Sequence, residues 1–95
     1  MPIVLKHHHT SQIYTCNLIN GYRLEYYGTK FWDDMDKANE QVEEFLQMMG
    51  DDPQDWELYE IEESKMKIFN VRLKNDPKNE LYLDDAGRPI IKRVE

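Results

Sequence analysis

The chain has 95 residues and a mass of 11.5 kDa, the size of one domain. Nineteen acidic residues against 12 basic ones give a net charge of −7, which disfavours direct binding to nucleic acid or an anionic membrane. One cysteine excludes an intramolecular disulfide, and the apolar run Ile3-Val4-Leu5 is too short for a signal segment or membrane span. We therefore expect a single cytoplasmic domain over residues 1–95.

The first third of the chain has the pattern of β-strands. Residues 3–9 form one predicted strand, and residues 13–19 and 22–27 form the arms of a hairpin. Asn20-Gly21 is the preferred pair for a two-residue turn between such arms. The sequence therefore predicts an N-terminal antiparallel meander.

The two-residue turn would place bulky apolar side chains on both faces of the hairpin. One face would carry Ile13, Ile19, Tyr22, Leu24 and Tyr26, and the other Tyr14, Cys16, Leu18 and Tyr27. A sheet with one face in water shows a cleaner alternation. We therefore expect the second face to be covered by the C-terminal segment, by a second copy in a homodimer, or by a partner.

Residues 34–49 are predicted to form the main amphipathic helix. Its apolar residues recur with helical spacing along one face, at Met35, Ala38, Val42, Phe45, Leu46 and Met49. Asp33 or Asp34 would cap the first turn, Gly50 suits the residue after the last turn, and Pro53 prevents continuation.

The segment after the helix is less clear. Residues 56–63 fit a strand and a short helix almost equally well, and we favour a strand because the β-prone run 66–73 follows a short break. Residues 81–83 and 90–94 are predicted to form a closing hairpin, with Gly87 in its loop. The expected fold is α+β, with a largely antiparallel sheet, C-terminal hairpins and one main helix.

Charge is distributed very unevenly along the chain. Residues 1–32 have a net charge of +2 and residues 64–95 a net charge of +3. Residues 33–63 contain 13 acidic residues and one basic residue, a net charge of −12. The middle third therefore carries more than the whole net negative charge.

This acidic helix and loop suggest a docking surface for a protein with a basic surface, because clustered charge accelerates encounter and selects partners. Aromatic residues would add apolar contact. The candidate partner-binding residues are Asp36, Glu40, Glu43, Glu44, Asp51, Asp52, Asp55, Tyr27, Trp32 and Trp56. Two alternatives are a merely solvated helix face and an acidic imitation of nucleic acid that inhibits a DNA- or RNA-binding protein.

A transition-metal site is a weaker alternative, and the only cofactor that the sequence suggests. His7 and His9 would point to the same side of a strand. If Thr10-Ser11 connects the first two strands, Leu5 lies opposite Cys16, and the thiol would supply a third ligand.

Other catalytic patterns lack support in the sequence. The four glycines form no phosphate-binding motif, and neither serine lies in a nucleophile elbow. An apolar interior position is expected for Cys16 rather than a nucleophilic one. We therefore expect a small acidic interaction or regulatory module that is not an enzyme.

Overall fold

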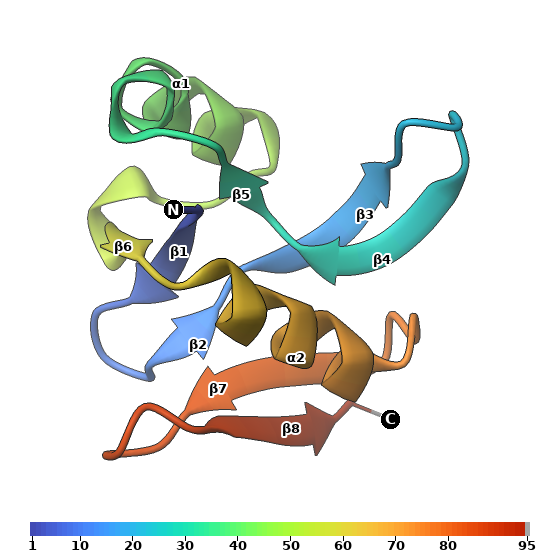
Figure 1. Ribbon diagram of the computed structural model, residues 1–95. Helices are drawn as coiled ribbons and strands as arrows, with labels where there is room; N and C mark the ends of the chain where they lie inside the picture. The colour runs from blue at the N-terminus through green and yellow to red at the C-terminus, as the bar shows by residue number, and fades with distance from the viewer. Residues whose placement is uncertain (95) are drawn as a thin grey trace.

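A computed structural model describes residues 1–94 and shows an α+β fold, as the sequence predicts (Figure 1). Every paired strand is antiparallel to its neighbour. In chain order the elements are β1 (Ile3–His7), β2 (Gln12–Ile13), β3 (Thr15–Ile19), β4 (Glu25–Thr29), β5 (Phe31–Trp32), α1 (Met35–Met48), the 3-10 turn η1 (Pro53–Asp55), β6 (Trp56–Glu60), α2 (Glu63–Leu73), β7 (Asn79–Leu83) and β8 (Pro89–Arg93).

The main sheet is built around β1, which is paired on both edges. β6 pairs along the whole of β1 on one edge, whereas β5 and β2 share the other edge. β7 pairs with β2, and β8 forms the outer strand. The central position of β1 explains why Ile3, Val4 and Leu5 are all fully buried, since both faces of this strand are covered.

β3 and β4 form a two-stranded ribbon that projects from the main sheet (Figure 1). Only Tyr14 separates β2 from β3, and only Lys30 separates β4 from β5. The Tyr14 amide donates to the Leu5 carbonyl at 3.0 Å, and the Tyr14 carbonyl accepts from the Lys30 amide at 3.0 Å. The ribbon therefore diverges from the sheet at these two residues.

The two α-helices cover opposite faces of the main sheet (Figure 1). The core on the α2 side consists of Val4, Ile13, Ile61, Met66, Phe69, Leu73, Leu81 and Leu83. The core on the α1 side consists of Ile3, Leu5, Tyr14, Trp32, Ala38 and Leu46. Neither helix in residues 1–94 is long and apolar enough to cross a membrane.

The predicted main helix is confirmed as α1. Asp34 is its N-cap, and its carboxylate accepts from the Lys37 amide at 2.8 Å. Met49 is the C-cap, and Gly50 follows with a φ of +79°, the left-handed conformation that glycine adopts without strain.

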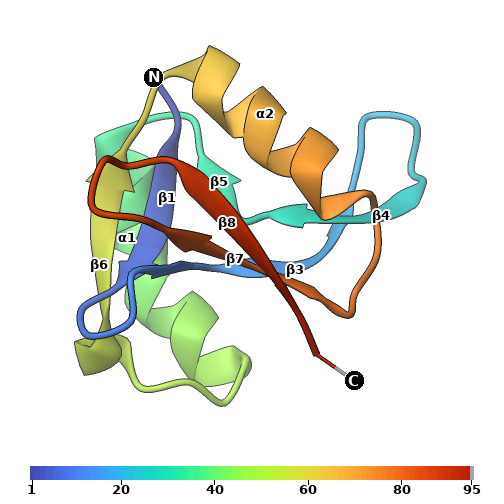
Figure 2. The same cartoon turned by 90° about the horizontal axis from the view of Figure 1, so that it is seen from below.

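The prediction of a strand over residues 66–73 is wrong, because this segment belongs to α2. Ile68 and Val71 gave the segment its β-prone composition, but both are exposed. Its buried residues, Met66, Phe69 and Leu73, have the spacing of a helix face. α2 therefore covers the face of the main sheet opposite to α1 (Figure 2), whereas Ile19 and Leu24 of the predicted hairpin stay exposed.

Two other predictions for the second half are confirmed. Residues 56–60 form a strand, β6, although the strand ends before residue 63. β7 and β8 form the closing hairpin, and Gly87 has a φ of +78° in its loop.

The predicted hairpin register at Asn20-Gly21 is wrong by three residues. Ile19 lies opposite Glu25 rather than opposite Tyr22. The Asn20 side chain accepts from the amides of Tyr22 (2.9 Å) and Leu24 (3.0 Å), which stabilises a five-residue loop in place of the two-residue turn. Leu18 consequently lies opposite Tyr26.

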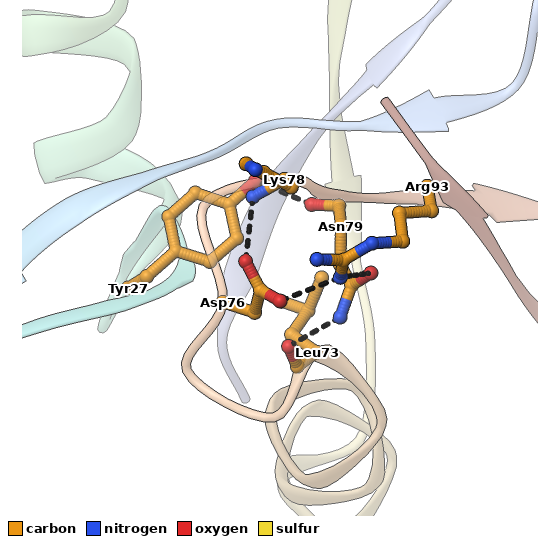
Figure 3. Close-up of polar contacts among 6 residues, drawn as sticks. All are labelled: Tyr27, Leu73, Asp76, Lys78, Asn79 and Arg93. Atoms are coloured by element: carbon orange, nitrogen blue, oxygen red, sulfur yellow. Dashed lines mark hydrogen bonds and ion pairs between the residues drawn. The ribbon is translucent and has the colours of Figure 1, made fainter. Parts of the chain in front are cut away.

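A polar cluster joins the ribbon to α2 and β7 (Figure 3). The Tyr27 hydroxyl donates to the Asn79 carbonyl at 2.6 Å. The buried Asn79 amide group donates to the Leu73 carbonyl at the end of α2, at 3.0 Å. Arg93 pairs with Asp76 at 2.6 Å in the adjoining loop. These bonds hold the root of the ribbon against the body of the protein.

Candidate protein-interaction surface

The exposed side of α1 is strongly acidic. We call Asp36, Glu40, Glu43 and Glu44 the acidic face; all four side chains are exposed. They lie away from the helix side that packs on the sheet, where Ala38 and Leu46 are fully buried. The periodicity seen in the sequence thus produces a helix with one apolar side and one acidic side.

No side chain of the acidic face forms an ion pair within residues 1–94. In residues 1–94 the ion pairs join Arg88 to Asp84 and Arg93 to Asp76, and His8 lies 3.5 Å from Glu57. Glu40 also has acidic neighbours three or four positions away at Asp36, Glu43 and Glu44, and such like-charge pairs destabilise a helix. The face therefore presents a negative field, which Lys37, the basic residue of α1, offsets only in part.

The acids of the loop after α1 have structural roles instead. Asp51 accepts from the Tyr14 hydroxyl, and Asp52 accepts from the Gln54 amide at 2.9 Å. The carbonyl of Asp55 accepts from the His8 amide at 2.9 Å. Burial, and then the contact with Asp51, raise the pKa of Tyr14 above its usual value. The loop is thus fixed next to α1, and of these three acids Asp52 is exposed while Asp51 and Asp55 are half-buried.

The three predicted aromatic contact residues pack into the protein. Trp32 is 6% exposed, and its indole N–H donates to Gln41 at 3.0 Å. Trp56 is half-buried, with its ring centroid 4.9 Å from that of Tyr14, and Tyr27 belongs to the polar cluster of Figure 3. The structure therefore does not bring them together with the acidic face as one exposed surface.

The most exposed aromatic side chain is one that sequence reasoning did not select. Tyr22, in the loop of the ribbon, is 87% exposed, and Ile19 and Leu24 beside it are also exposed. Their position in the loop depends on the hydrogen bonds of Asn20, which the preference for a two-residue turn obscured.

A groove of about 710 Å³ separates the ribbon from the C-terminal end of α1. Cys16, Leu18 and Tyr26 line it on the ribbon, and Phe45 and Met49 line it on the side of α1. Lys30 lies at its root, with its ammonium group 4.8 Å from the Trp32 ring centroid and 4.7 Å from that of Phe45. The groove is therefore largely apolar, and its cation already rests on aromatic rings.

The proposed metal ligands do not assemble. In residues 1–94 no three His, Cys, Asp or Glu side chains lie together in a way that could hold a metal ion. Lys6 lies opposite Ile13, which shifts the register away from the predicted pairing of Leu5 with Cys16. The His7 ring nitrogen Nδ1 accepts from the His9 amide at 3.1 Å and so stabilises the turn after β1.

Cys16 is half-buried on the ribbon. Burial raises the pKa of its thiol, and the positive charge of Lys30 offsets this only in part. The thiol is therefore protonated at neutral pH, unlike an activated nucleophile.

Comparisons with protein-family models, curated proteins and solved structures gave no match. Function is therefore inferred from surface chemistry. Two features stand out: the acidic face on α1, which forms no ion pair within residues 1–94, and the projecting, weakly charged ribbon.

Proposed function

We propose that the protein is a small cytoplasmic interaction module, not an enzyme, whose acidic face binds a protein with a basic surface. The observation that carries this proposal is the absence of any ion-pair partner for Asp36, Glu40, Glu43 and Glu44 within residues 1–94. A basic partner would relieve the mutual repulsion of these carboxylates and would be attracted over a distance.

The anchoring of α1 supports a role as a rigid binding element. Its apolar side packs on the main sheet, and the Tyr14–Asp51 contact fixes the loop at its C-terminal end. The acidic side chains are thus presented from a helix that need not fold on binding, which lowers the entropy lost on association.

Two triple variants test the proposal at equal net charge. The first, Glu40→Gln, Glu43→Gln and Glu44→Gln, neutralises most of the acidic face. The control, Glu60→Gln, Glu62→Gln and Glu63→Gln, removes three exposed charges at β6 and the start of α2. Proteins retained from a lysate of the source cells are identified by mass spectrometry, and their association rates with each purified variant are then measured.

We expect a basic partner whose association slows by about tenfold or more with the first variant, and much less with the control. High salt should reduce the difference, because it screens exposed charges. Equal association rates for both variants and the unmodified protein would contradict the proposal.

The alternative function is inhibition of a nucleic-acid-binding protein by imitation of the phosphate backbone. It predicts that DNA or RNA competes with the module for the same partner, and that binding has a steep salt dependence. A partner that binds the acidic face equally well in the presence of nucleic acid would exclude this alternative.

A further inference from the structure

The rest of the chain provides hydrogen-bond partners for one edge of the ribbon, that of β4. On the outer edge of β4, the Tyr27 amide donates to the Asn75 side chain at 2.7 Å. The next outward amide, that of Thr29, donates to the Asn70 side chain at 2.9 Å. Residues of α2 and its following loop thus satisfy this edge.

The edge of β3 has no comparable cover. Backbone groups alternate in direction along an antiparallel pair, so the outward amides of Tyr27 and Thr29 imply outward groups at their opposite residues on β3. The amides and carbonyls of Thr15, Asn17 and Ile19 therefore point away from β4. Thr15 lies at the root of the ribbon, where its hydroxyl contacts the Tyr27 hydroxyl that donates to the Asn79 carbonyl, so Asn17 and Ile19 form the open part of this edge. Within residues 1–94 the ribbon contains only these two strands, so no third strand pairs with this edge.

The edge of β3 also lacks the features that keep edge strands apart. β6 carries Glu57 and Glu60, and β8 carries Pro89, Lys92 and Arg93. Charges and prolines of this kind discourage edge-to-edge pairing. β3 reads Thr-Cys-Asn-Leu-Ile, without a charge or a proline, in a chain of which 33% is charged.

We propose that the edge of β3 binds the same edge of a second copy of this chain, forming a four-stranded antiparallel sheet across a two-fold axis. With the open part of the edge limited to Asn17 and Ile19, the register that uses all of its backbone groups places Asn17 opposite the partner's Ile19 and Leu18 opposite the partner's Leu18. This arrangement forms four backbone hydrogen bonds.

The charge on the ribbon favours a second copy over the basic partner of the acidic face. The only charged residues of the ribbon and its loop are Arg23 and Glu25, so their net charge is zero, and β3 itself carries no charge. Two copies of this edge can therefore meet without electrostatic repulsion. Such an edge offers no attraction to a basic protein. Pairing also brings the 73% exposed Ile19 beside the second copy and covers apolar surface. This inference goes beyond the proposed function, because the acidic face takes no part in it.

Sedimentation velocity over a range of protein concentrations tests the dimer with a pair of proline variants. Asn17→Pro removes an outward amide from the edge of β3, whereas Glu25→Pro removes one from the edge of β4. Across the two-fold axis Asn17→Pro eliminates two of the four hydrogen bonds, so we expect the dimer dissociation constant to rise about tenfold or more. Glu25→Pro should leave it nearly unchanged. Circular dichroism checks that both variants fold.

Cross-linking tests the register without weakening the edge. In a Cys16→Ser background, Leu18→Cys places two thiols directly opposite each other in a non-hydrogen-bonded pair, whose backbone spacing of about 4.5 Å permits a disulfide. Ile19→Cys is the control, because its symmetry mate lies diagonally, about 7–8 Å away. Mild oxidation should give a covalent dimer much faster for Leu18→Cys.

Three outcomes would overturn the inference: a monomer at every concentration, equal effects of the two proline variants, or cross-linking of Leu18→Cys no faster than that of Ile19→Cys. High salt separates this proposal from the acidic-face proposal. Pairing of uncharged edges should persist at high salt, whereas binding of a basic partner should weaken.

Discussion

The two α-helices lie on opposite faces of one sheet and differ in almost every physical respect (Figure 1). α1 separates its residues into an apolar side and an acidic side, and its last turn has no basic residue. α2 has Glu63 in its first turn and Arg72 in its last, which is the arrangement that the helix dipole favours. The exposed side of α2 carries charged residues together with the apolar Ile68 and Val71.

Because of this difference, the sequence of α1 reveals more about the helix than the sequence of α2 does. The pattern of α1 reveals both its structure and a candidate function, because its polarity changes with helical period and its charge is left unpaired. The pattern of α2 conceals the helix, because apolar residues occur on both sides. The predictions below test the two helices against each other.

The largest expected effect is the loss of the α2 core. Phe69 is fully buried, so Phe69→Ala should lower the free energy of unfolding by about 3–5 kcal/mol in urea denaturation. Val71→Ala is the control; Val71 is 73% exposed, and alanine favours a helix, so its effect should be near zero. A large loss with Val71→Ala and a small one with Phe69→Ala would contradict a helix in this segment.

The sequence predicted the elements whose local signals agree and failed where side chains from elsewhere decide the outcome. α1 has caps, periodicity and a terminal glycine that all indicate the same helix. In α2, the buried positions of Met66, Phe69 and Leu73 are set by the sheet that they cover, which a strand-like composition does not reveal. The ribbon register depends on bonds from the Asn20 side chain, which override the preferred two-residue turn.

The exposure of the candidate contact residues was likewise predictable only where local signals decide it. Solvated carboxylates such as Glu40 follow directly from the helix pattern. Burial of Trp32 and Trp56 does not, because it requires the two-sided sheet to be known. The open edge of β3 becomes visible only when the opposite edge is seen to be closed by Asn70 and Asn75.

The second prediction concerns the contact that anchors the end of α1. Tyr14→Phe leaves Asp51 without its hydroxyl partner and should lower the free energy of unfolding by about 1.5–3 kcal/mol at neutral pH. Burial and then Asp51 raise the pKa of Tyr14, so its protonated phenol stabilises the fold below about pH 10, the usual pKa of tyrosine. That contribution is lost as the pH rises further.

Urea denaturation at a series of alkaline pH values therefore checks the Tyr14 prediction. The difference in unfolding free energy between the unmodified protein and Tyr14→Phe should shrink above about pH 10. The other tyrosines are common to both proteins and cancel in this comparison. A difference that stays constant with pH would show that the hydroxyl contributes nothing through its ionisation.

The third prediction isolates the repulsion within the acidic face. Glu40→Gln removes the repulsion of Glu40 with Asp36, Glu43 and Glu44 at once, and also its weaker attraction to Lys37. It should raise the free energy of unfolding by about 0.5–1 kcal/mol at low salt. Glu43→Gln is the control, since only Glu40 is an acidic neighbour at helical spacing. High salt should reduce both gains. Equal gains from the two variants would mean that net charge, rather than helix spacing, sets the cost.

The smallest expected effect lies on the side of α2, where Asp76 pairs with Arg93 (Figure 3). The Arg93 guanidinium, and then the Lys78 amide, hold the pKa of Asp76 below its usual range. The ionised form therefore stabilises the fold above the ordinary aspartate pKa, and this contribution is lost as the pH falls through the lowered value. Asp76→Asn should lower the urea midpoint slightly at neutral pH and not at all in strong acid.

Asp84 provides the matched comparison for Asp76. Its pKa is also lowered, but the main favourable cause is a hydrogen bond from the Arg88 amide, which is 2.8 Å from the carboxylate. Salt screens an exposed ion pair more than a short hydrogen bond to the backbone. Asp84 also pairs with the Arg88 side chain at 3.1 Å, but the amide bond contributes most, so the effect of Asp76→Asn should decrease at high salt more than that of Asp84→Asn. Equal salt dependence would contradict a larger ionic share in the Asp76–Arg93 contact than in the contacts of Asp84.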